Sequence, residues 1–206
     1  MLAGRPPRFY RAVVMGVSAG GLAALRTILA ELPAAFPVPL VVVQHRGPED
    51  DGFLAHYLDQ HCPLRVKDAE DKEPAVPGTV YLAPANYHLL LEDDGSFALS
   101  LEGRVKFARP SIDLLFESAA DVYGAALVAI VLTGANDDGS RGLAAVKRRG
   151  GLVVVQDPAT AEAVAMPEAA IKTVAVDFVL PLPAIGPLLV KLYTAARDSQ
   201  RGWSNL

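Results

Sequence analysis

The chain has 206 residues, of which 51% are hydrophobic and 20% charged, and its formal net charge is −4. No apolar run reaches the ~18 residues of a membrane-spanning helix, and the acidic balance argues against nucleic acid as a partner. A lone cysteine, Cys62, excludes an internal disulfide. Because the first eleven residues also lack an apolar signal core, we expect a cytoplasmic protein without membrane insertion.

The first half of the chain alternates short apolar runs with segments of helical periodicity. A single domain is predicted to fill residues 1–206, with a basic N-terminal extension over residues 1–11. The predicted elements are, in order, a strand over 12–15, a helix over 22–32, a strand over 39–44, a short helix over 53–61 and a strand over 79–83.

The second half continues this alternation after one hairpin, whose turn is Asp93-Asp94-Gly95-Ser96. Its predicted elements are strands over 88–92 and 97–101, a helix over 111–123 capped by Ser111, a strand over 126–132, a helix through 147, a strand over 152–156 and a helix over 183–197. The pattern predicts an α/β fold: a doubly wound, mostly parallel sheet with helices on both faces and a small antiparallel hairpin at one edge.

Ser18 lies in Gly16-Val17-Ser18-Ala19-Gly20-Gly21, between the first predicted strand and the first predicted helix. A serine on such a turn is placed as an oxygen nucleophile, because the N–H groups of the helix N-terminus can stabilise a developing oxyanion. The same N–H groups also suit a phosphate, which leaves a nucleotide-binding α/β protein as one alternative. The turn lacks the middle glycine of the dinucleotide fingerprint and the lysine of a P-loop.

His45 ends the strand over 39–44, and Asp137 and Asp138 follow the strand over 126–132. The carboxyl ends of parallel strands meet at one edge of a sheet, so these side chains can form a triad with Ser18. The alternatives are a histidine that only bonds a backbone carbonyl, and an Asp138 or Ser140 that caps the next helix. Spacing alone does not choose between the two aspartates.

Taken together, the motifs resemble the catalytic domain of the CheB family, the chemotaxis protein-glutamate methylesterases. The resemblance extends from about Val13 to Pro181. Besides the Ser18 turn, its motifs are Val43-Gln44-His45, Pro77-Gly78-Thr79-Val80-Tyr81-Leu82-Ala83-Pro84, Arg109-Pro110-Ser111-Ile112-Asp113, Leu132-Thr133-Gly134, Asp138-Gly139 and Met166-Pro167.

The resemblance implies a triad in which Ser18 is the nucleophile, His45 the base and Asp138 the acid. It also implies the substrate: methyl esters of glutamate side chains on the cytoplasmic helices of a chemoreceptor or chemoreceptor-like signalling protein. Many members of the family also deamidate glutamines there. No grouping of Cys and His has metal spacing, so neither a metal nor a cofactor is expected. A non-catalytic module that binds a receptor helix is the competing hypothesis, and retention of all three residue types argues against it.

Three further residues are candidates for contacts with the substrate. Backbone N–H groups near Ala19 and Ala135 are expected to stabilise the oxyanion, although the family usually has threonine and methionine at these positions. Arg109 is expected either to hold the acidic receptor helix or to anchor the helix over 111–123. Many members carry a phosphoacceptor receiver domain, and only about a dozen residues precede the first strand here. We therefore expect activity that is not switched by a receiver domain of its own.

Overall fold

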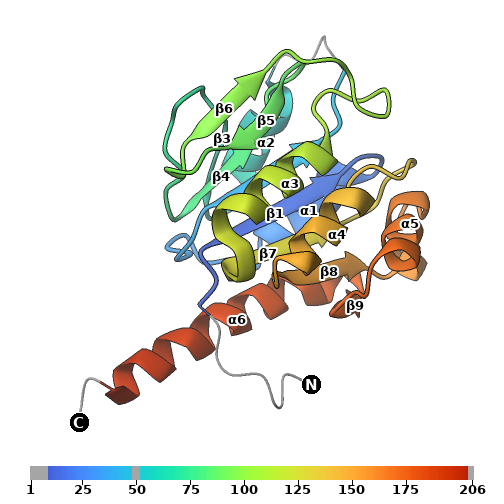
Figure 1. The fold of residues 1–206 in the computed structure, drawn as a ribbon. Helices are drawn as coiled ribbons and strands as arrows, with labels where there is room; N and C mark the ends of the chain where they lie inside the picture. Colours follow the sequence, from blue (N-terminus) through green and yellow to red (C-terminus); the bar gives the residue numbers. More distant parts are fainter. Residues whose placement is uncertain (1–8, 48–51, 204–206) are drawn as a thin grey trace.

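The fold is built on a seven-stranded parallel sheet with the strand order β3-β4-β2-β1-β7-β8-β9 (Figure 1). The computed structural model describes residues 9–47 and 52–203, with side chains up to residue 194. The strands of the sheet are β1 (Ala12–Val17), β2 (Leu40–Gln44), β3 (Arg65–Asp68), β4 (Thr79–Leu82), β7 (Leu127–Val131), β8 (Leu152–Gln156) and β9 (Phe178–Leu180). All six pairings in this sheet are parallel.

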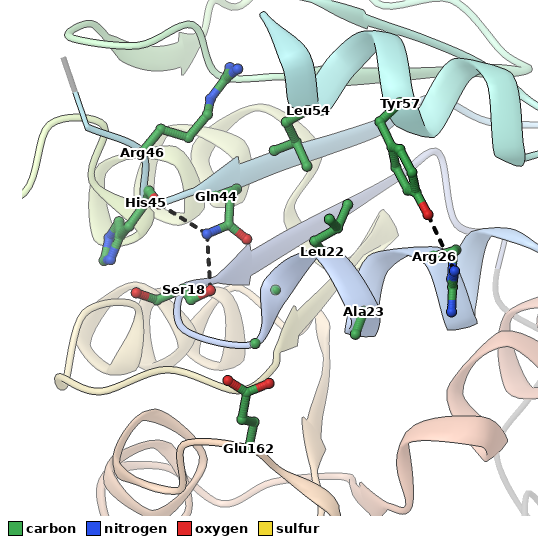
Figure 2. A pocket seen from close by; sticks show the side chains of 12 residues that line it. Ser18, Leu22, Ala23, Arg26, Gln44, His45, Arg46, Leu54, Tyr57 and Glu162 are labelled. Carbon is green, nitrogen blue, oxygen red and sulfur yellow. Dashed lines mark hydrogen bonds between the residues drawn. The ribbon is translucent and has the colours of Figure 1, made fainter. Parts of the chain in front are cut away.

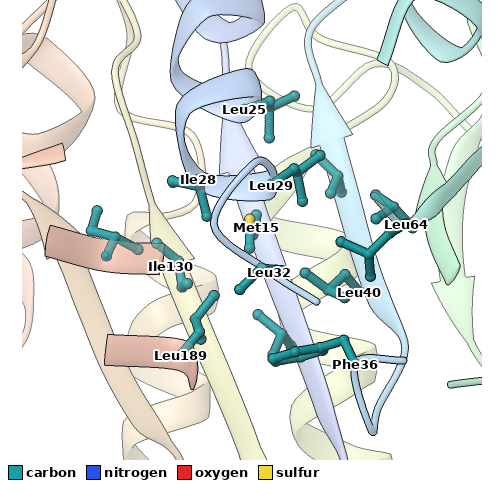
Figure 3. Packing of buried hydrophobic residues seen from close by; sticks show 14 of the residues in the cluster. Met15, Leu25, Ile28, Leu29, Leu32, Phe36, Leu40, Leu64, Ile130 and Leu189 are labelled. Atoms are coloured by element: carbon teal, nitrogen blue, oxygen red, sulfur yellow. The ribbon is translucent and has the colours of Figure 1, made fainter. Parts of the chain in front are cut away.

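Helices cover both faces of the sheet, because successive residues of the buried strands point to opposite faces. On β1, Val13 and Met15 belong to one apolar cluster and Ala12 and Val14 to the other. The first cluster, part of which Figure 3 shows, packs under α1 (Gly21–Leu29), α2 (Phe53–His61) and α6 (Leu182–Trp203). The second packs under α3 (Ile112–Tyr123), α4 (Ser140–Arg148) and α5 (Ala165–Thr173).

The predicted hairpin forms as β5 (His88–Leu91) and β6 (Phe97–Ser100). It is a separate two-stranded sheet that packs against α3 and is not hydrogen-bonded to the parallel sheet. Two short 3₁₀ helices, η1 (Gly124–Ala126) and η2 (Pro158–Thr160), complete the elements of the described chain. Among these residues no helix is both long and apolar enough to cross a bilayer.

The predicted α/β class is confirmed, while several local expectations differ from the structure. The alternative in which Asp138 or Ser140 caps the next helix does not hold, since the N-cap of α4 is Gly139 in a left-handed conformation with φ 94° and no side chain makes a capping bond. Ser111 is the N-cap residue of α3, but its side chain makes no capping bond. β3, β9 and α5 were not predicted.

The direction of the chain connections places a crevice beyond the carboxyl ends of β1 and β7. From β1 the chain goes to β2 on one side, whereas β7 is followed by β8 and β9 on the other. Such a switch point is where ligands bind in open α/β sheets. Ser18, His45 and Thr133, each the first or second residue after its strand, therefore meet at one edge.

Gly16 allows the start of α3 to approach β1 closely. A Cβ at this position would lie 2.2 Å from Ile112 Cγ2. No real Cβ contact is that short, so any side chain at residue 16 must push Ile112, the first residue of α3, away from the sheet. The distance between the strand ends and the N-terminus of α3 thus depends on a glycine.

We predict that Gly16→Ala lowers the free energy of unfolding by about 1–3 kcal/mol, the usual cost of overpacking a core. Urea unfolding would measure the change. Gly103→Ala is the matched control, because a Cβ at residue 103 meets nothing within 4 Å. Equal stability of the two variants would contradict the proposed close packing.

Candidate active site

The register of β1 and β2 brings Ser18 and His45 to adjacent positions. Val17 pairs with Gln44, and the His45 N–H donates to Val17 O at 3.1 Å. The Ser18 N–H donates to Thr133 O at 3.0 Å, which ties the end of β1 to the end of β7. Ser18 and His45 both line a cavity of about 550 Å³ (Figure 2).

His45 forms a hydrogen-bonded pair with Asp138 and not with Asp137. His45 Nε2 lies 2.9 Å from Asp138 Oδ2, and the Asp138 side chain is completely buried. Asp137 is 63% exposed and pairs with Lys106 at 3.0 Å. Among the hydrogen bonds of the described residues, none joins the Ser18 hydroxyl to His45. The geometry therefore supports Asp138 as the acid next to the histidine.

The N-terminus of α3 and the N-cap residue of α4, Gly139, surround the Asp138 carboxylate with donors. They are Ile112 N–H to Oδ2 at 2.8 Å and, to Oδ1, Asp113 N–H at 3.0 Å, Ser111 Oγ at 3.1 Å and Gly139 N–H at 3.0 Å. Burial alone raises the pKa of Asp138, but the bond from His45 and the N–H bonds from Ile112 and Asp113 outweigh it and hold the pKa below its usual value. The carboxylate is thus charged and fixed in orientation.

His88 contacts the backbone of Ser111, the residue whose hydroxyl donates to Asp138. It is completely buried, its Nδ1 accepts from the Ser111 N–H at 3.1 Å, and its Nε2 donates to Gly103 O at 3.1 Å. Both ring nitrogens are therefore used by the backbone. The sequence reasoning did not assign this residue to the site, and its contacts place it behind the N-terminus of α3.

The two expected oxyanion donors lie on exposed turns beside Ser18. Within the part of the chain that the structure describes, neither the Ala19 N–H nor the Ala135 N–H has a hydrogen-bond acceptor. A Cβ on Gly134 would lie 3.0 Å from Ser18 Cβ and 1.9 Å from Met166 Sδ, so this turn passes directly against the serine. Both N–H groups remain available to an oxyanion.

Two glutamines that the sequence reasoning did not single out hold the turns of the site in place. Gln44 Nε2 donates to both Ser18 O and His45 O at 2.9 Å. Gln156 Oε1 accepts from the Thr133 N–H at 2.9 Å, and its Nε2 donates to Thr160 O at 2.8 Å. Each glutamine ends an otherwise apolar Leu-Val-Val-Val-Gln strand, and that lone polar side chain was the available signal.

Arg109 anchors loops and does not line the Ser18 cavity. Its guanidinium donates to Asn86 Oδ1 and to Leu101 O, each at 2.7 Å, and to Glu102 O at 3.0 Å. It lines a second cavity of about 250 Å³, which it shares with His45. None of these bonds reaches α3, so both expected roles of Arg109, holding an acidic receptor helix and anchoring the helix over 111–123, stay predictions.

The described residues contain no cluster of three or more His, Cys, Asp or Glu side chains suited to a metal ion. A serine, a histidine and a buried aspartate that pairs with the histidine, all at the carboxyl edge of a doubly wound parallel sheet, are the parts of a serine hydrolase. The sequence agrees with this class: residues 13–189 match the CheB methylesterase family, and the chain belongs to that family.

Relatives support the same assignment. A protein of Leptospira interrogans named putative protein-glutamate methylesterase/protein-glutamine glutaminase is 51% identical, covering 89% of this chain and 95% of that protein. The protein-glutamate methylesterase FrzG of Myxococcus xanthus is 38% identical, and the match covers 91% of this chain and 56% of FrzG. The crystal structure of the Thermotoga maritima CheB methylesterase catalytic domain matches with a TM-score of 0.86 and 39% identity, covering 89% of this chain and 98% of that chain.

These findings confirm the family and the fold that the sequence motifs implied. They also confirm the expected enzyme class, because these relatives are named protein-glutamate methylesterases. They do not favour the nucleotide-binding alternative or the non-catalytic module.

The lowered pKa of Asp138 predicts a specific acid sensitivity. A carboxyl whose pKa is lower in the folded chain stabilises the fold above its unfolded pKa of about 3.9 and loses this contribution as pH falls through the folded value. We expect the wild-type stability to fall more steeply below about pH 4 than that of Asp138→Asn, which has no proton to take up there.

Urea midpoints between pH 5 and pH 2 would measure the two slopes. Asp137→Asn is the control, because its exposed side chain makes no contact with His45, and it should follow the wild type. Parallel slopes for the wild type and Asp138→Asn would contradict the prediction.

Proposed function

We propose that this chain is a serine-dependent esterase that hydrolyses glutamyl methyl esters on a chemoreceptor or chemoreceptor-like signalling protein. The observation that carries the proposal is that His45, which lines one cavity with Ser18, is paired with the buried carboxylate of Asp138. Membership of the CheB methylesterase family supports the substrate class, and no cofactor is required for this chemistry.

In the proposed first step, His45 removes the Ser18 proton and Ser18 Oγ attacks the ester carbonyl carbon. Because Nε2 of His45 already donates to Asp138, the opposite ring nitrogen, Nδ1, is the one left to accept the serine proton. The negative charge moves to the carbonyl oxygen, where the N–H groups of Ala19 and Ala135 are the proposed donors.

Collapse of the tetrahedral intermediate then breaks the bond between the carbonyl carbon and the methoxy oxygen. Methanol leaves with the proton from His45, and Ser18 holds the glutamyl group as an ester. A water molecule, activated by the same histidine, hydrolyses this ester and releases the free glutamate side chain. Asp138 stabilises the imidazolium that forms in both halves.

A primary amide fits the same sequence of steps with ammonia as the leaving group. The Leptospira relative is named for a glutaminase as well as a methylesterase. Deamidation of receptor glutamines is therefore included in the proposal, and ammonia release from an unmethylated receptor fragment would measure it.

The test of the proposal is methanol release from a methylated cytoplasmic receptor fragment. Ser18→Ala should lower turnover by roughly 10⁴-fold or more, as the loss of a nucleophile does in other triads. Ser100→Ala is the matched control on the hairpin, where the serine hydroxyl accepts from the Glu102 N–H and lies outside the Ser18 cavity. Near-normal methanol release by Ser18→Ala would overturn the proposed mechanism.

The two adjacent aspartates provide a second test. We expect Asp138→Asn to lower kcat/KM by roughly 10³-fold or more, because an amide cannot both accept the α3 N–H groups and stabilise an imidazolium. Asp137→Asn should change kcat/KM by less than about fivefold, the scale of an exposed ion pair. A larger loss of kcat/KM from Asp137→Asn than from Asp138→Asn would contradict the assignment of Asp138 as the acid of the triad.

A further inference from the structure

The cavity beside Ser18 extends away from the proposed catalytic residues, between α1 and α2. Figure 2 shows Ser18 and His45 at one end and the Arg26–Tyr57 pair at the other. Between the two ends the lining is apolar and consists of Leu22 and Ala23 from α1 and Leu54 from α2. A substrate bound at Ser18 therefore has room to contact the Arg26 end.

Arg26 brings a positive charge that no acidic group of the described chain neutralises. Its Nη1 donates to the Tyr57 hydroxyl at 3.2 Å, and no carboxylate of the described residues lies within 4.0 Å of its guanidinium. The other arginine of the lining, Arg46, is bonded to Asp68 at 2.5 Å and is almost completely buried. Arg26 is thus the exposed cation of the cavity wall.

Glu162, which also lines the cavity, is not positioned to neutralise Arg26. Its Oε2 would lie 2.8 Å from a Cβ on Gly20, at the N-terminus of α1. Arg26 lies in the last turn of the same helix. In Figure 2 Glu162 lies near the Ser18 turn, where α1 begins, and Arg26 lies toward the other end of the helix.

Two contacts with His61 position Tyr57 beside the guanidinium of Arg26. The Tyr57 ring stacks on His61 with a centroid distance of 4.1 Å and an interplanar angle of 17°. Its backbone carbonyl accepts from His61 Nδ1 at 2.6 Å. A guanidinium has five N–H donors in a planar fork, and the bond to Tyr57 uses one of them. The remaining donors match the two oxygens of a carboxylate.

We propose that Arg26 and Tyr57 form a carboxylate subsite that selects substrate segments by a second acidic side chain near the glutamyl ester. This inference rests on the proposed function, since it assumes that the ester binds at Ser18. The rise of α1 from Gly21 to Arg26 is about 7.5 Å, or about one and a half helical turns. If a helical substrate segment lies along α1, the subsite would bind the carboxylate of an acidic residue one to two helical turns from the glutamyl ester.

Synthetic helical peptides would test the subsite directly. Each peptide carries one γ-methyl glutamate and, either four or seven residues away, a glutamate or a glutamine. For at least one spacing, the wild type should bind the glutamate peptide about tenfold or more tightly, the scale of a charged hydrogen bond. Arg26→Gln should remove this preference, and the loss in turnover should fall mainly on KM. Arg26→Glu should favour a peptide with lysine at that position.

Two control variants distinguish a subsite at Arg26 from a general effect of the protein's positive charge. Arg148→Gln removes an exposed arginine of α4, which lies under the other face of the sheet and outside this cavity, and should keep the preference. Tyr57→Phe retains the ring and the charge of Arg26 but removes the orienting hydroxyl, so it should weaken the preference without abolishing it.

Binding of the same peptides to the Ser18→Ala variant, measured by calorimetry, makes the test independent of catalysis. Charge-dependent binding without any methanol release from the wild type would support the subsite and overturn the proposed function. Methanol release with equal KM and equal binding for glutamate and glutamine peptides at both spacings would overturn the subsite and leave the esterase intact. A lower melting temperature of Arg26→Gln with an unchanged preference would also overturn it.

Discussion

The carboxylate of Asp138 is the interaction on which the rest of the site depends. Burial of an isolated charge is costly, and here five donors compensate for it: the ring of His45, the hydroxyl of Ser111 and the N–H groups of Ile112, Asp113 and Gly139. The free N–H groups of a helix N-terminus attract negative charge. Asp138 thereby joins the turn after β7 to the start of α3 and to the histidine after β2.

This arrangement requires three backbones to approach each other closely, and small residues make that possible. Gly16 leaves space for Ile112 above the end of β1, and Gly134 leaves space for Met166 and Ser18 at the next turn. Gly139 adopts a left-handed conformation and turns the chain into α4 directly after the carboxylate. The part of the site around Asp138, Ser111 and Ile112 is therefore built into the packed interior.

The sequence was informative wherever one strong local signal decided the structure. The apolar runs before Ser18 and His45 predicted parallel strands, and parallel strands necessarily bring their following residues to one edge. The sequence did not predict the structure where a residue's interaction partner comes from a distant part of the chain. Ser111 has the residue type of a helix cap, yet Asp138, which is 27 residues away, accepts the N–H groups of that helix. β3 was missed because three of its four residues, Arg65, Lys67 and Asp68, are charged, and its pairing is decided by the neighbouring strand.

The same network also decides which atom of the histidine can act as a base. Asp138 is ionised and accepts from Nε2, so the neutral imidazole has its proton on Nε2 and its lone pair on Nδ1. The backbone of His45 is in turn fixed by its N–H bond to Val17 and by Gln44, which also holds Ser18 O. The side-chain amide of Gln44 therefore bonds to the backbone of both the nucleophile and the base. These backbone hydrogen bonds set the relative orientation of Ser18 and His45 before any substrate binds. Substrate selection is left to the side chains of α1 and α2, whose surfaces can vary without disturbing the sheet edge.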